Sequence, residues 1–250
     1  MGRQTILELE ASGADTPLAT VRAWNALALR TIGAAQSARA LALVHTCMYN
    51  AWAAYDGNAR QTMHGVAVRL PRAERDAASQ AAAMGHAARA VLAGPDADPG
   101  LDAGPFTPAG IGRTQAAALL DVRHRDQPFA LMPAEVRPAA AARPLALVSV
   151  WCDVAQRVSI RDGHGDDRDV LLFFVLANAL ADADDAARDG VCAAFAAAEV
   201  LRRFTGSDHL DAATFTEMAA QAGPGPGQDM GRKIGARVFD KARRYWQGRF

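Results

Sequence analysis

The sequence predicts an all-α protein, a single-domain helical bundle that spans residues 1–250. Alanine is very abundant, and it costs almost no side-chain entropy in a helix while letting helices approach closely. Half of the residues are hydrophobic, which is enough apolar material for one full core. Stretches in which β-branched residues alternate with polar ones are nearly absent. Together these three observations favour helices that pack on helices.

Helix positions follow from apolar periodicity together with start and stop signals. Proline stands in the first turn at Pro17, Pro71 and Pro108, where its missing N–H would have no partner anyway. Ser37 and Asp229 precede apolar stretches and are expected to cap them. The predicted helices lie at 17–32, 37–56, 71–92, 108–125, 145–160, 191–204, 211–222 and 229–246, and a further helix starts at Asp166 or Asp167.

Segments rich in glycine and proline separate the helices. Residues 94–108 are predicted to form an exposed loop, and the linker GPGPGQ at 223–228 cannot be helical. Residues 1–16 are predicted to be an N-terminal extension. Gly190 either breaks the helix before it or only kinks the chain ahead of residues 191–204.

Charge and cysteine content narrow the classes of function. The 27 basic and 27 acidic residues cancel, which argues against a nucleic-acid partner or an anionic-membrane anchor. The longest nearly uncharged apolar run, 171–181, is too short to span a bilayer, and the N-terminus has no signal-peptide pattern, so a cytoplasmic location is expected. Cys47, Cys152 and Cys192 stand in apolar helical patterns, which predicts buried reduced thiols.

The most informative stretch is 171–190, in which an apolar run passes abruptly into aspartates. In a helix, Asp182, Asp185 and Asp189 share one face, and Asp184 lies beside them. Such carboxylates are either solvated residues at a helix end or acids held at the mouth of a cavity. A carboxyl group that is desolvated beside another one has its pKa raised by roughly 3–5 units. A protonated acid in an apolar pocket can protonate an alkene or an epoxide.

Several stretches, taken in order, resemble the bacterial vanadium-dependent haloperoxidases, relatives of acid phosphatases that share their helical fold. Together they cover well over half of the chain, so the resemblance implies that fold. Asn50 stands where we expect an aspartate. The stretches are WNALALRTI (24–32) with SARALALVHTCMYNAWAAYDGNA (37–59), GIGRTQAAALLDVRHRDQ (110–127), VWCDVAQRVSIRDG (150–163) with LLFFVLANALADA (171–183), and FTEMAAQAG (215–223) with DMGRKIGARVF (229–239).

The groups that hold vanadate in that family are missing. The family uses a lysine and an arginine on one helical segment, a Ser-Gly-His motif, and a later arginine and histidine, all of which bind an oxyanion. In this sequence the residues from Asp189 to Cys192 occupy the position at which the family has its lysine. No Ser-Gly-His motif occurs, and GPGPGQ stands in place of the later arginine and histidine. The resemblance therefore implies the fold but argues against haloperoxidase or phosphatase activity and against a vanadate cofactor.

Two functions from different classes remain open. The first is a repurposed enzyme of specialised metabolism, a cyclase or isomerase similar to terpene cyclases, in which Asp182, Asp184 and Asp185 are the catalytic acids. These residues match the DxDD motif of class II terpene cyclases, and with Asp189 they loosely match a DDxxxD motif for magnesium. An apolar small-molecule substrate would be held by Asp189 and by aromatic residues that stabilise a cation, namely Trp24, Trp52, Tyr55 and Phe174.

The second function is that of a non-catalytic descendant that binds a partner protein or a small ligand. No residue is predicted to be a metal ligand. Magnesium binding would be suggested only by the loose match to the DDxxxD motif. His45 is interpreted as a core histidine bonded to a backbone carbonyl, and His164 with the aspartates after it as a capped turn. The basic residues from Arg232 to Arg249 are interpreted as a solvated helical face. The sequence leaves a homodimer open.

Overall fold

Within the residues that the structure describes, every regular element is a helix, which confirms the all-α prediction. The computed structural model describes residues 20–32, 37–93, 104–126, 145–187, 190–206, 210–221, 223 and 225–247. The helices are α2 (Thr20–Thr31), α3 (Ser37–Ala53), α4 (Ala77–Ala93), α5 (Pro108–Asp126), α6 (Leu145–Arg161), α7 (Asp166–Ala187), α8 (Gly190–Thr205), α9 (Leu210–Ala220) and α10 (Gly227–Trp246), with a short 3-10 turn at Arg72–Glu74.

The start of α4 differs from its prediction. Pro71 is followed by the 3-10 turn and not by a long helix, and α4 begins at Ala77. The reason is a better cap, because the Asp76 carboxylate accepts a hydrogen bond from the N–H of Ser79 at 2.8 Å. That hydrogen bond also lowers the pKa of Asp76.

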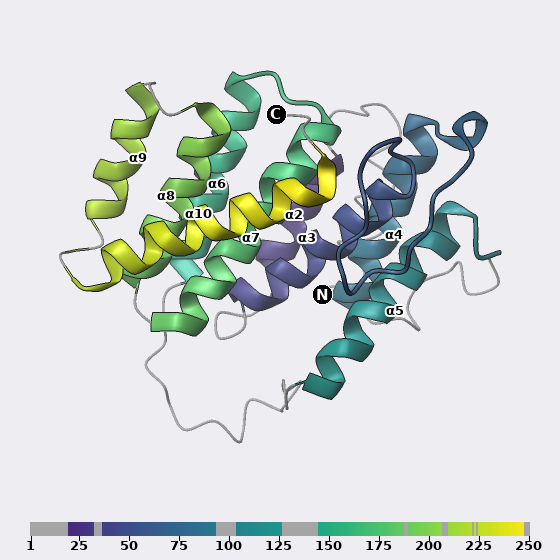
Figure 1. Cartoon of the computed structure of the whole chain (residues 1–250), viewed down its shortest axis with the longest axis horizontal. Coiled ribbons are helices and arrows are strands. Elements are labelled where there is room, and N and C mark those ends of the chain that lie inside the picture. The colour runs from purple at the N-terminus through teal and green to yellow at the C-terminus, as the bar shows by residue number, and fades with distance from the viewer. Residues whose placement is uncertain are drawn as a thin grey trace.

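The centre of the molecule is an antiparallel pair, α3 and α7 (Figure 1). Residues 169–177 of α7 are all buried, as expected for a helix that is apolar on every side. The two helices stay in contact along their whole length because polar, aromatic and charged pairs occur at successive turns. From one end to the other, these pairs join Trp52 to Asp167, Tyr49 to Phe174, Thr46 to Asn178 and Arg39 to Asp185.

The helix is broken before Gly190 and not merely kinked there, because α7 ends at Ala187 and a separate helix, α8, begins at Gly190. The chain reverses between α7 and α8, since Arg168 near the start of α7 donates a hydrogen bond to the carbonyl of Phe204 near the end of α8 at 3.3 Å. After α9, α10 returns across α8 and α7, as Figure 1 shows in yellow. α10 runs parallel to α8, because Gly231 lies against Cys192 and Trp246 contacts Phe204.

Two glycines let α10 approach the alanine-rich α8. A Cβ atom on Gly231 would lie 2.3 Å from the Cys192 carbonyl oxygen, and one on Gly235 would lie 2.5 Å from the Ala196 carbonyl oxygen. Both distances are far below van der Waals contact, so only glycine fits at these positions. The close contact fixes which side of α10 faces the solvent.

The other half of the bundle consists of α4 and α5, which pack beside α3. The chain between α3 and α4 lies against them and is held by buried amides. The Gln115 side chain exchanges hydrogen bonds with both backbone groups of Val66, at 2.8 and 3.0 Å. Asn50 accepts a hydrogen bond from the N–H of Thr62 at 2.8 Å, so it serves this segment where an aspartate was expected.

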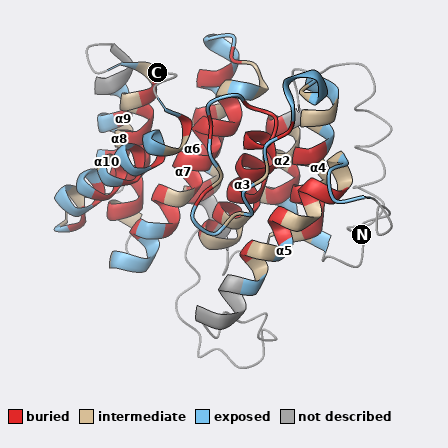
Figure 2. Cartoon of the chain, turned by 45° about the vertical axis from the view of Figure 1, so that its right-hand side comes forward, coloured by how far each residue is buried: buried red, intermediate tan, exposed pale blue. Residues whose placement is uncertain are grey.

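Burial divides the described residues into an interior with two hydrophobic clusters and an exposed exterior (Figure 2). All three cysteines are free and buried, as predicted. In the described part of the chain, no helix combines the length and apolarity needed to cross a bilayer.

Candidate binding surface at the end of α7 and along α10

The aspartates at the end of α7 are surface residues. Asp182, Asp184 and Asp185 are all exposed. Asp182 lies 3.7 Å from Arg237 of α10, and Asp185 forms an ion pair with Arg39 of α3. The two arginines come from different helices, so the carboxylates do not converge on one point.

Of the two alternatives left open by the sequence for these three carboxylates, the structure has the solvated helix end and not the apolar pocket. At this end of α7 the buried positions are Ala181 and Ala183, and the aspartates occupy the outward ones. These exposed carboxylates lack the apolar surroundings that a proton donor to an alkene or an epoxide would need. Asp189, expected to complete the cluster, lies outside the described residues.

The aromatic residues expected to bind substrate do not gather near these aspartates. Trp52 is fully buried and donates a hydrogen bond to Asp167 at 2.7 Å, in the first turn of α7. Residues 167 and 182 are 15 positions apart, which corresponds to about 22 Å along a helix. A single substrate pocket formed by Trp52 and the terminal aspartates is therefore excluded.

The remaining aromatic residues of that expected set are packing residues. Phe174 stacks on Tyr49 with a centroid distance of 4.4 Å. Tyr55 is buried in a separate cluster with residues of α4 and α5. Trp24 lies against α4, where a Cβ on Gly85 would be 3.3 Å from its ring nitrogen. Phe174 and Tyr55 belong to the core, and Trp24 is half-buried against it.

The buried histidines have structural surroundings. His45 shares a hydrogen bond with the Asn25 side chain at 3.0 Å and stacks on Phe173, so its partner is not the backbone carbonyl expected. Burial lowers the pKa of His45 to about 3. A side chain of this kind stays neutral in the folded protein and has no access to a substrate.

The aspartates after His164 have partners on neighbouring helices. The carboxylate of Asp166 accepts a hydrogen bond from the N–H of Val21 at 3.1 Å, and the carboxylate of Asp167 accepts one from the Trp52 ring N–H of α3. Asp169 lies 3.4 Å from His164 and 3.5 Å from Arg22 of α2. Among the described residues, no three His, Cys, Asp or Glu side chains are grouped as metal ligands. This cluster joins α2 and α3 to the start of α7.

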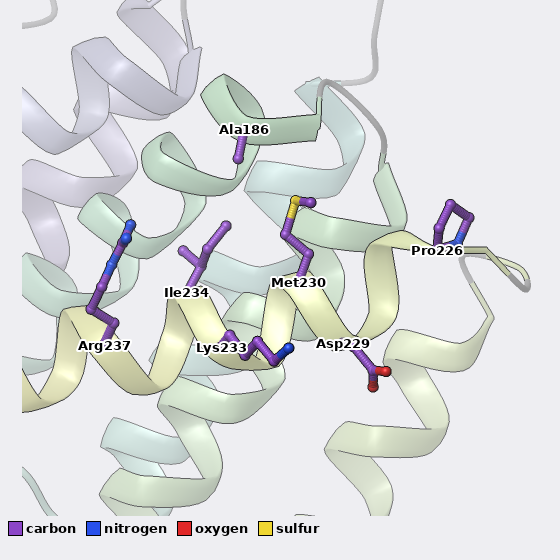
Figure 3. A pocket seen from close by; sticks show the side chains of 7 residues that line it. All are labelled: Ala186, Pro226, Asp229, Met230, Lys233, Ile234 and Arg237. Carbon is purple, nitrogen blue, oxygen red and sulfur yellow. The ribbon is translucent and has the colours of Figure 1, made fainter.

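Two open hollows lie along α10. The first is bounded by α7 on one side, and Figure 3 shows Met230, Ile234 and Arg237 pointing toward the helix end that carries Ala186. Its lining residues are Ala186, Pro226, Asp229, Met230, Lys233, Ile234 and Arg237. The second is lined by Lys233, Ala236, Arg237, Asp240, Lys241 and Arg244.

Most of the charged side chains that line these two hollows are cationic. Lys233, Arg237, Lys241 and Arg244, here called the cationic face, are all exposed and recur every three or four residues on one side of α10. Asp240 lies among them, but it pairs with Arg203 of α8 at 3.1 Å. The spacing of these cations was visible in the sequence, where they were interpreted only as a solvated face.

The junction before α8 and the junction before α10 lie close together. A Cβ on Gly225, in the linker before α10, would be 3.8 Å from Val191 at the start of α8. Ala186 and Pro226, which flank these two junctions, line the same hollow.

Comparison of this chain with protein-family models, curated proteins and solved structures finds no match in any of the three. The resemblance to haloperoxidases therefore rests on the sequence motifs alone.

Proposed function

We propose that this chain is a non-catalytic binding protein on a haloperoxidase-like helical scaffold, and that its cationic face binds an acidic segment of a partner protein. The observation that carries the proposal is the row of four exposed cations along α10, next to a hollow with an apolar floor. This function is the second of the two alternatives that the sequence leaves open.

The form of the hollows favours a protein partner over a small molecule. Small-molecule sites usually enclose most of their ligand, whereas both hollows along α10 are open to solvent. A protein segment can lay its side chains across such a surface. Met230, which is 44 % exposed, and Ile234 provide contacts for an apolar side chain of the partner.

The charges favour an acidic segment. Cations that are four residues apart on a helix stand about 6 Å apart along its axis, a spacing that successive carboxylates of an extended or helical segment can match. Arg237 and Arg244 can each bind a carboxylate with two parallel hydrogen bonds. Attraction at such an exposed surface weakens as salt screens it.

A titration of a fluorescein-labelled peptide rich in glutamate and leucine tests this function. We expect the full chain to bind this peptide, and the variant Lys241→Glu with Arg244→Glu to bind it at least about tenfold more weakly, because like charges then face each other. Binding should also weaken between about 0.1 M and 1 M salt, where the Debye length falls from about 10 Å to 3 Å.

Arg72→Glu with Arg157→Glu is the matched control for this titration, since it changes the net charge equally at exposed positions away from α10. The control variant should keep the affinity of the wild type. Equal losses in both variants would show that only the overall charge matters, and the assignment of α10 would be wrong.

A product assay separates this function from the acid-driven cyclase. Incubation with prenyl diphosphates and polyenes, with and without magnesium, should give no product by mass spectrometry. Turnover by the wild type that disappears in Asp184→Asn and Asp185→Asn would restore the catalytic function and contradict the proposal.

A further inference from the structure

We infer that the partner on the cationic face is a second copy of this chain, whose exposed aspartates at the end of α7 supply the acidic segment. Asp182, Asp184 and Asp185 are here called the acidic tip. The inference deepens the proposed function and rests on it, because it names the occupant of the same surface.

The acidic tip and the cationic face are parts of one continuous surface. Asp182 lies 3.7 Å from Arg237, so the two regions meet there within a single chain. The cations further along α10, Lys241 and Arg244, are exposed, and no ion pair within the described residues includes either of them. The surface therefore carries both signs of charge in separate regions, as a self-complementary interface requires.

Within one chain Asp182 already faces Arg237 and Asp185 pairs with Arg39. A two-fold arrangement would therefore bring the exposed acidic tip of one copy to cations of the other that have no ion pair of their own among the described residues. Two cationic faces stacked directly on each other would repel, so the copies must be displaced along α10. The displaced arrangement sets the acidic tip of each copy against Lys241 and Arg244 of its partner, and every contact occurs twice. It also covers Met230, which lies beside the tip and is 44 % exposed.

The overall charge does not oppose this association. The chain has 27 basic and 27 acidic residues, so two copies carry no net charge that would repel at long range. A net charge near zero at the working pH promotes association of this kind. The attraction then comes from the local arrangement of the charges.

Two charge-reversed variants of the full chain test the inference by sedimentation velocity. The face variant carries Lys241→Glu and Arg244→Glu, and the tip variant carries Asp184→Lys and Asp185→Lys. We expect the wild type at about 0.1 M salt to sediment with twice the mass of one 26.4 kDa chain, and as a monomer at about 1 M salt, where screening is nearly complete.

Each variant alone should be monomeric, with self-association weakened on the order of 100-fold, because like charges oppose each other twice in the interface. An equimolar mixture of the two should restore the dimer, since the reversed face of one copy then meets the reversed tip of the other. Circular dichroism of each variant verifies that it is folded. The control Arg72→Glu with Arg157→Glu should dimerise like the wild type.

A wild type that stays monomeric at every concentration, or a dimer that both variants keep, overturns the inference. If the monomer still binds the glutamate-rich peptide through α10, the proposed function stands and only the second copy is excluded. If it binds neither the peptide nor itself, both are wrong. Binding of a single-stranded oligonucleotide in place of the peptide also contradicts both.

Discussion

Adding one methyl group to each of Gly231 and Gly235 is expected to lower the free energy of unfolding by about 4 kcal/mol in total. A side chain forced into a packed contact costs about 1–3 kcal/mol, and replacing glycine by alanine in a helix regains about 1 kcal/mol of intrinsic propensity. The new Cβ atoms would meet carbonyl oxygens at 2.3 and 2.5 Å. Backbone atoms cannot rotate away, so the steric cost is at the upper end and dominates.

Urea denaturation of Gly231→Ala with Gly235→Ala, compared with Gly165→Ala, measures this effect. A Cβ on Gly165 meets nothing within 4 Å, so the control has no steric cost, and its stability should change by no more than about 1 kcal/mol, the scale of a cap preference at the start of α7. A double variant as stable as the wild type would mean that α10 does not pack closely on α8. In that case the outward orientation of the cationic face would lose its basis.

Acidification is expected to destabilise the protein through His45. Its pKa is lowered to about 3 in the folded state, below the ordinary value of 6.5 that applies when the chain is unfolded. Between these values the unfolded chain binds a proton that the folded protein excludes, so stability falls as the pH is lowered through this window. By pH 4.5 the loss from His45 alone is about 3 kcal/mol relative to pH 7.

Asp169 changes the stability of the protein in the opposite direction over part of the same pH range. Burial raises its pKa to about 6, so between its ordinary value and 6 the folded state binds the extra proton and stability falls as the pH rises. The two contributions partly cancel in the wild type. Variants of each residue are therefore needed to measure them separately.

Unfolding measured from pH 7 to pH 4.5 should separate the two groups. His45→Gln is expected to lose the acid destabilisation from this site, and Asp169→Asn should be destabilised by acid more steeply than the wild type. The same replacement at His64, which is exposed, is the control for His45. A His45→Gln variant with the pH dependence of the wild type would contradict the assignment of a buried neutral imidazole.

Most of the helices could be predicted because their signals are local. Ser37 starts α3 and Pro108 starts α5 at the predicted residues. The failure at Pro71 is also local, since Asp76 provides the stronger cap only five residues later. The prediction that Asp229 caps the last helix after a non-helical linker over 223–228 is also wrong, because α10 already begins at Gly227, after Pro226. Such start and stop signals can be recognised from residues that are close together in the sequence.

The direction of the aspartate face could not be predicted. Alanine is acceptable both inside and outside a bundle, so Ala181 and Ala183 give no periodic signal that identifies the buried side. The separation of Trp52 from the acidic tip depends on the antiparallel pairing of α3 with α7, which is a tertiary fact. In α10, by contrast, apolar residues such as Ile234 and Val238 alternate with cations strongly enough to show which side faces outward.

We propose that the cationic face of α10 is a binding surface for carboxylates. Hydrogen–deuterium exchange of the full chain, with and without the glutamate-rich peptide, locates the binding directly. We predict slower amide exchange in α10 and at the end of α7, with α4 and α5 unchanged. Protection confined to α4, α5 or the segment between α3 and α4, with α10 unaffected, would contradict the claim.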